Sequence, residues 1–192
     1  MTNVITAKIV YKNCDNKIWR EIQISENSFL CQLGYVLLAT FDTMAYHLFC
    51  IEHSGINYRL PSEGESVESD KCLISVKLSD LKLKTGDKLS MIYDFGCDQV
   101  FDIIIIDVSP MPKGSGRAYP KIIAGEGLGI IDDVPADELL EVINDIEQND
   151  GSVFYYEGKR PEVPWDYRKY NIDNDNALLK RQLEIISENY GY

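Results

Sequence analysis

The segment VFDIIIIDV, residues 100–108, decides the fold because it is typical of a strand in the core of a sheet. Isoleucine and valine favour extended backbone since they are branched at Cβ. Apolar residues occupy both odd and even positions, a pattern typical of strands covered on both faces, and we expect both faces to be covered here. YDFG, residues 93–96, is expected to form a turn that leads into this strand. That turn is the first place to search for a functional site.

Alternating segments on the N-terminal side predict a β-hairpin. Residues 3–11 and 17–24 alternate, and the turn-forming cluster KNCDN separates them. In residues 29–41 the leucines recur at helical spacing, which predicts an amphipathic helix packed on the sheet. Further strands are expected at 45–52, 56–61, 88–94 and 121–129, polar loops at 62–72 and 110–118, and helices within 132–151 and 171–191.

These elements predict an α+β fold, because strands pair as hairpins and no β-α-β alternation is present. We expect a mostly antiparallel β-sheet with helices packed on it. The sequence shows no clear domain boundary, so residues 1–192 are interpreted as a single domain. An aromatic and helical C-terminal segment, residues 152–192, is expected to pack on the sheet. Six aromatic residues lie close together in its first part, namely Phe154, Tyr155, Tyr156, Trp165, Tyr167 and Tyr170.

The composition narrows the partners and the compartment. The formal net charge of −12 repels phosphate backbones and argues against nucleic-acid binding. The five cysteines are widely spaced and contain no C-x-x-C pair, which argues against a disulfide framework or a zinc knuckle. No signal peptide or membrane-spanning run is recognised. We therefore expect a cytoplasmic protein without a cofactor, whose partner is a protein or a small ligand.

Four segments in order resemble one family. Residues 18–58 are similar to W-R-x-I followed by a leucine-rich helix and H-L, and residues 76–96 are similar to L-x-D-L, G-D and Y-x-Y-D-F-G. Residues 118–134 are similar to Y-P-x-C-L-x-G-E-G-x-x-P-P-E-D, and residues 169–183 to F-D-x-x-x-x-N-x-x-L. Together they resemble the plasmid pRiA4b ORF-3-like family, which is often encoded near mobile elements.

The resemblance implies a compact α/β roll and no established reaction, substrate or cofactor. The family usually continues its Y-D-F-G as D-x-W-x-H, whereas this chain has Cys97, Gln99 and Phe101 at the acid, tryptophan and histidine positions. The proline pair after G-E-G is Ile130-Ile131 here. If the family uses that acid and that histidine in a polar site, this chain has lost part of the site.

Several carboxylates follow predicted strands and are candidates for chemistry. The candidate catalytic residues are Asp94, Glu126 and Asp133, whose oxygens suit Mg²⁺ or Ca²⁺ and also acid–base work if they converge. Asp98 and Asp132 belong to the same set of acids that could hold the cation if the two loops meet. The structural alternative is that Asp94 caps a turn and Gly96 supplies a positive φ, while Asp132 and Asp133 lie near a helix N-terminus and Glu126 pairs with a lysine or arginine.

The candidate ligand-binding residues are Tyr93, Asp94, Gly96, Glu126 and His47. His47 and His53 are six residues apart within one predicted strand, so both would share a face if the strand were straight. The structural alternative for His47 is a contact with the core or with Tyr93.

Three functions are consistent with these features. The first is a binding or protein-interaction module without catalytic activity, because no recognised catalytic constellation is present. The second is a metal-assisted hydrolase or nucleotide-processing enzyme that uses the carboxylate cluster. The third is a DNA-associated accessory protein of a mobile element, which follows only from the resemblance and conflicts with the negative charge.

Overall fold

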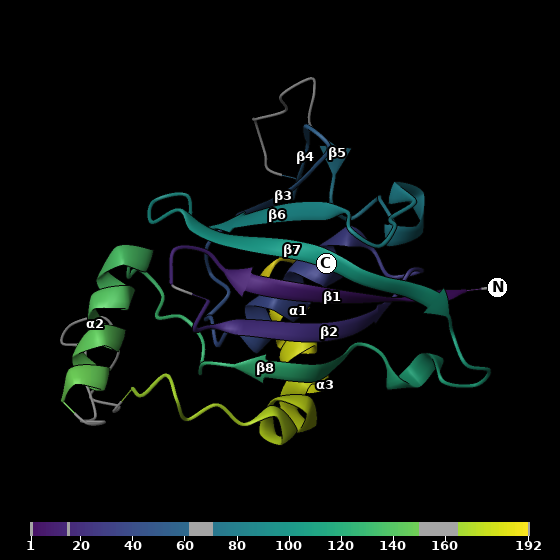
Figure 1. Cartoon of the computed structure of the whole chain (residues 1–192). Helices are drawn as coiled ribbons and strands as arrows, with labels where there is room; N and C mark the ends of the chain where they lie inside the picture. The colour runs from purple at the N-terminus through teal and green to yellow at the C-terminus, as the bar shows by residue number, and fades with distance from the viewer. Residues whose placement is uncertain (1, 15, 62–70, 150–164, 192) are drawn as a thin grey trace.

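The computed structural model describes residues 2–14, 16–61, 71–149 and 165–191, and these form one eight-stranded sheet with three α-helices (Figure 1). The α+β prediction is therefore confirmed. The strands are β1 (Asn3–Tyr11), β2 (Trp19–Ser25), β3 (Phe49–His53), β4 (Ile56–Arg59), β5 (Lys71–Cys72), β6 (Lys88–Tyr93), β7 (Gln99–Pro110) and β8 (Lys121–Glu126). The helices are α1 (Leu30–Thr40), α2 (Ala136–Gln148) and α3 (Ile172–Asn189).

The strand order is β5-β4-β3-β6-β7-β1-β2-β8, and every neighbouring pair is antiparallel except β4 and β5. The predicted N-terminal hairpin is β1 with β2, and a second hairpin joins β6 to β7. β7 pairs with both β6 and β1, so it lies inside the sheet, as its sequence predicts.

The prediction that β7 is covered on both faces is wrong. Phe101, Ile103 and Ile105 are buried, whereas Ile104 is only half-buried and Ile106 is 38% exposed. α1 and α3 both lie behind the sheet in Figure 1 and pack against each other, so they cover the same face. A register shift opposite β1 leaves Ile106 as an extra residue in the ladder, a bulge that adds to its exposure.

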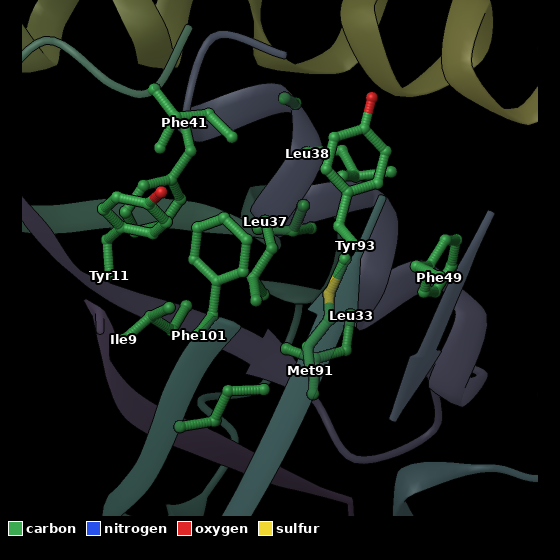
Figure 2. Packing of buried hydrophobic residues seen from close by; sticks show 14 of the residues in the cluster. Ile9, Tyr11, Leu33, Leu37, Leu38, Phe41, Phe49, Met91, Tyr93 and Phe101 are labelled. Carbon is green, nitrogen blue, oxygen red and sulfur yellow. The ribbon is translucent and has the colours of Figure 1, made fainter. Parts of the chain in front are cut away.

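α1 packs its leucine-rich face against the sheet, as its spacing predicts. Leu30, Leu33 and Leu37 are almost fully buried. A Cβ at Gly34 would lie 2.2 Å from the ring of Phe49, so this glycine permits the close approach of α1 to β3. Tyr11, Phe41 and Phe101 meet at the end of the core under α1, and Met91, Tyr93 and Phe49 continue it, as Figure 2 shows.

The other two helices form within the ranges predicted for them. α2 buries Leu139, Ile143 and Ile146, and α3 buries Leu179 and Ile186. α3 contacts α1 and β8. The aromatic residues at 154–156 and residues 62–70 of the polar loop predicted at 62–72 lie outside the described residues, and the last two residues of that loop form β5 instead. No helix in the described ranges is both long and apolar enough to span a membrane. The five cysteines, all of which are described, form no disulfide bond.

One strand boundary differs from its prediction in a way that matters for the site. The strand expected at 45–52 begins only at Phe49, so His47 lies in the irregular segment between α1 and β3. The condition for His47 and His53 to share one face, a straight strand that contains both, is therefore not met. Positive φ values at Asp42 and Ala45 interrupt the extended backbone before β3.

A fully buried arginine joins the sheet to the segments that leave it. Arg20 on β2 is 0% exposed, and its guanidinium donates to the carbonyl oxygens of Thr40, Trp19, Glu126 and Leu128 at 2.8–3.1 Å. Burial lowers the pKa of Arg20 to about 10, so the group stays charged at neutral pH.

Two rings and one carboxylate also lie around this guanidinium, and we call them, together with the four carbonyls, the Arg20 cage. The Arg20 Cζ atom lies 3.7 Å from the ring centroid of Tyr170 and 5.0 Å from that of Phe41, both favourable for cation–π contact. Asp175 Oδ2 on α3 lies 4.0 Å from Nε. A Cβ at Gly125 would lie 2.9 Å from both Arg20 Cδ and the Tyr170 ring, so glycine is required for this packing.

We predict that Arg20→Lys lowers the free energy of unfolding by about 3 kcal/mol or more, because an ammonium group cannot replace the planar fork and buried carbonyls lose their donors. Urea denaturation measures this. Arg168→Lys is the control, since Arg168 is 41% exposed and pairs with Asp166, and its effect is expected below about 1 kcal/mol. Equal losses in the two variants would contradict the role given to Arg20.

Candidate functional site

The YDFG segment ends β6 and forms the predicted turn into β7. Tyr93 is the last residue of β6, and Asp94 adopts a left-handed conformation with φ 54°. Its Oδ1 accepts a hydrogen bond from the Gly96 N–H at 3.1 Å, which confirms that Asp94 caps the turn. The positive φ predicted for Gly96 is wrong, because Asp94 and Asp98 adopt the left-handed conformation instead.

Two further side chains meet Asp94 from distant parts of the chain. His47 Nε2 lies 3.5 Å from Asp94 Oδ2 and 3.0 Å from Asp133 Oδ1. One potential ligand atom from each residue lies within 4.8 Å of the other two. We call these three residues the His–Asp cluster. It joins the segment after α1, the end of β6 and the segment before α2.

The Asp94 carboxylate is buried and incompletely satisfied. Asp94 is 5% exposed, and its Oδ2 accepts no hydrogen bond from any described residue. The 3.5 Å separation from His47 Nε2 is within ion-pair range but does not meet hydrogen-bond criteria. A buried carboxylate oxygen without a donor costs about 1–3 kcal/mol, so this atom calls for an explanation.

Three hydrogen bonds fix the residues around the cluster. The Tyr46 hydroxyl donates to Asp133 Oδ2 at 2.5 Å, and the Tyr93 hydroxyl donates to Asp132 Oδ1 at 3.0 Å. Asp132 Oδ2 accepts from the Met44 N–H at 2.7 Å. The bond to Asp133 raises the pKa of Tyr46, and burial followed by the Asp132 charge raises the pKa of Tyr93, so both hydroxyls remain donors.

Two of the three separations within the cluster are close to those in the shell of a metal ion. A tetrahedral cation with bonds of about 2.0–2.2 Å to nitrogen and oxygen places its ligand atoms about 3.4 Å apart. The 3.0 and 3.5 Å separations around His47 Nε2 lie on either side of this value. The same nitrogen can instead donate to Asp133 when no cation is bound, because either ring nitrogen of a neutral histidine can carry the proton.

Glu126, the third carboxylate predicted for catalysis, lies apart from the cluster. It ends β8, and β7, β1 and β2 separate β8 from β6, a distance of about 19 Å at the usual strand spacing. Its Oε2 accepts from the Trp19 indole N–H at 3.3 Å. The chain after Glu126 returns toward β6 and delivers Asp132 and Asp133, so the G-E-G segment contributes to the site through its downstream acids.

The departures from the family pattern do not remove any member of the cluster. Phe101 is 0% exposed in the core, and Gln99 is equally buried. The Gln99 amide donates to the Val134 carbonyl at 2.7 Å and accepts from the Tyr11 hydroxyl. Cys97 is half-buried in the turn after Asp94. Phe101 and Gln99 therefore serve core packing in this chain.

Four exposed apolar side chains lie close to the cluster in sequence. Met44, Tyr46, Leu48 and Phe95 are between 46% and 60% exposed, and each is next to or within three residues of His47 or Asp94. The Leu48 carbonyl accepts from the Asp94 N–H, which places Leu48 beside the turn. We call these four residues the apolar rim. Neighbouring exposed apolar side chains are typical of a binding surface.

A pocket of about 480 Å³ lies elsewhere, between α1 and α3. Its walls include Tyr35 and Val36 of α1, Leu183 of α3, and Pro120. None of the residues of the His–Asp cluster lines it, so the pocket and the cluster are separate features.

The fold and the cluster together define an α+β protein with a candidate cation centre at one end of its sheet. The chain belongs to the plasmid pRiA4b ORF-3-like protein family, whose model matches residues 3–174. It is also similar to the crystal structure of the protein of unknown function MM3350 from Methanosarcina mazei Go1. That match has a TM-score of 0.66 and 21% identity and covers 88% of this chain and 97% of the other.

The comparisons establish family and fold without an activity. The family and the solved structure are both of unknown function, and no match is found among curated proteins. His47, Asp94 and Asp133 all fall within the residues that the family model matches. They correspond to the histidine of H-L, the aspartate of Y-D-F-G and the final acid of the G-E-G segment.

Sequence reasoning named all three residues but placed them in different groups. His47 was assigned to ligand binding, and Asp133 was grouped with Glu126. Asp132 is among the acids that the sequence singles out, whereas the sequence does not indicate Tyr46, because its contact with Asp133 depends on the path of two irregular segments. One feature of the sequence could have grouped the three residues: His47, Asp94 and Asp133 lie in three different segments that resemble the family.

We predict that Asp94→Asn raises the free energy of unfolding of the cation-free protein by about 1 kcal/mol, because it removes the charge of a buried carboxylate whose Oδ2 has no donor. Asparagine keeps the acceptor for Gly96 and tolerates the left-handed backbone. Urea denaturation in the presence of a chelator measures this change. Asp98→Asn is the control, since Asp98 has the same conformation but is exposed. A destabilised Asp94→Asn protein would show that the carboxylate serves the fold.

Proposed function

We propose that this protein is a cytoplasmic, divalent-cation-dependent binding module whose cation lies among His47, Asp94 and Asp133. The observation that carries the proposal is the buried Asp94 Oδ2, which lacks a hydrogen bond and points toward His47. A cation at this position would satisfy that oxygen. It would also neutralise the two carboxylates of the cluster.

The ligand set favours a transition-metal ion over Mg²⁺ or Ca²⁺. One imidazole and two carboxylates suit Zn²⁺ or Mn²⁺, whereas Mg²⁺ and Ca²⁺ prefer oxygen ligands throughout. Three protein ligands leave at least one coordination position open. The side chains of His47 and Asp133 are 26% and 40% exposed, so an open position is accessible from solvent.

The apolar rim supports a binding role for the open position. A partner that supplies an oxygen donor to the cation would also cover Met44, Tyr46, Leu48 and Phe95, and burying such side chains favours association. A protein partner or a small ligand meets this description. The net charge of −12 argues against nucleic acid as that partner.

The proposal predicts that Mn²⁺ or Zn²⁺ binds to the protein and stabilises it. At a free cation concentration about 100-fold above Kd, the stabilisation is about 2.7 kcal/mol, which corresponds to a rise in Tm of about 5–10 °C for a chain of this length. Isothermal titration calorimetry with MnCl₂ and ZnCl₂, together with thermal melts, measures the affinity and the stabilisation.

Matched variants locate the site. Asp94→Asn and Asp133→Asn are expected to lose the titration heat and the Tm rise. Glu126→Gln removes an acid that lies outside the cluster and is expected to behave as the parent protein. Absence of binding in the parent, or equal loss in all three variants, would refute the proposed cation site.

A second candidate function is a metal-assisted hydrolase or nucleotide-processing enzyme. The accessible open position favours it, because catalytic zinc centres typically combine three protein ligands with one bound water. It predicts that the Mn²⁺- or Zn²⁺-loaded protein hydrolyses p-nitrophenyl phosphate, p-nitrophenyl acetate or ATP, and that Asp133→Asn abolishes the turnover. Cation binding without turnover on these substrates would leave the binding module as the remaining function.

A further inference from the structure

The C-terminal end of α3 reaches the candidate cation centre through Tyr190. The Tyr190 hydroxyl donates to the main-chain carbonyl of His47 at 2.5 Å. Its ring stacks on Tyr35 of α1 at 5.6 Å with an interplanar angle of 4°, and meets Phe49 of β3 edge-on at 5.4 Å. Burial raises the pKa of Tyr190, so the hydroxyl stays protonated and donates.

His47 depends on such contacts because it belongs to no helix or strand. The Met44 N–H is held by Asp132, and the Leu48 carbonyl is held by the Asp94 N–H. Between these two points, Tyr190 supplies the hydrogen bond to the His47 carbonyl. A shift of this carbonyl would move the imidazole relative to Asp94 and Asp133. The position of Nε2 is therefore tied to the docking of α3.

We propose that Tyr190 is a positioning residue for the cation centre and that docking of the α3 C-terminus is coupled to cation binding. The inference rests on the proposed cation site. The family model ends at residue 174, shortly after α3 begins, so Tyr190 lies beyond the matched residues. The contact is thus a feature of this chain that the family match does not supply.

The coupling must act in both directions. If the docked end of α3 raises the affinity for the cation, a bound cation must strengthen docking by the same factor. Bound Mn²⁺ or Zn²⁺ is therefore expected to slow amide exchange at residues 186–190. Because the cation also stabilises the whole fold, the coupling predicts that this slowing at residues 186–190 is reduced when the Tyr190 hydroxyl is removed.

The test compares Tyr190→Phe with Tyr167→Phe. Tyr190→Phe keeps the ring contacts and removes one hydroxyl donor. Tyr167→Phe is matched, because it also removes a hydroxyl donor, in that case to Glu147 Oε1 at 2.5 Å. We expect Tyr190→Phe to weaken Mn²⁺ and Zn²⁺ binding about fivefold, the effect of one ordinary hydrogen bond, and Tyr167→Phe to leave the affinity unchanged. Calorimetry measures both.

Hydrogen exchange provides the reciprocal measurement. In the parent protein the cation should slow exchange at residues 186–190 by several fold, and this slowing should be reduced in Tyr190→Phe. Equal cation affinity in the parent and Tyr190→Phe, or unchanged exchange on cation binding, would overturn the coupling while leaving the cation site intact. Absence of cation binding in the parent protein would instead overturn the proposed function, and the coupling with it.

Discussion

The buried guanidinium of Arg20 is the interaction on which the rest of the architecture depends. It donates to carbonyls at the end of α1, on β2 and on the segment that leaves β8, so three elements distant in sequence share one donor. Burying a charge in this way is costly unless it is fully paired. Here the four carbonyls and the two rings supply that pairing. The W-R and G-E-G segments, which carry much of the family resemblance, meet at this guanidinium.

The same cage sets the starting points of both irregular segments that build the His–Asp cluster. Thr40 is held at the end of α1, seven residues before His47, and Leu128 is held five residues before Asp133. The Ile130 N–H then donates to the Phe41 carbonyl, which joins the two segments directly. The short spans leave little freedom between the cage and the cluster. Arg20 therefore acts on the site through backbone position, without touching any of its side chains.

Local patterns were sufficient for most of the elements, because the hydrophobic periodicity of a strand or helix is a property of consecutive residues. The N-terminal hairpin, α1 and the antiparallel sheet followed from such patterns. The exposure of one face of β7 did not follow from its pattern, because Ile104 and Ile106 are as apolar as Ile103. Their burial differs only because α1 and α3 both lie on the same face of the sheet. The sequence was sufficient to name the candidate site residues. It could not show that His47, and not Glu126, joins Asp94 and Asp133, because that depends on the path of two irregular segments.

The cost of the His–Asp cluster argues that it is more than a structural device. Ala45, Asp94 and Asp133 adopt left-handed backbone with φ of 52–61°, and such residues other than glycine cost about 1 kcal/mol each. The buried oxygen of Asp94 adds a further cost. A turn between β6 and β7 could be made with fewer penalties by glycine or asparagine. Because Gln99 and Phe101 belong to the core, their departure from the family pattern leaves all three members of the cluster in place. The cluster thus combines two left-handed residues with a buried carboxylate oxygen that lacks a hydrogen bond, at the end of an otherwise well-packed sheet. Such a combination is expected where a protein retains a site for a ligand.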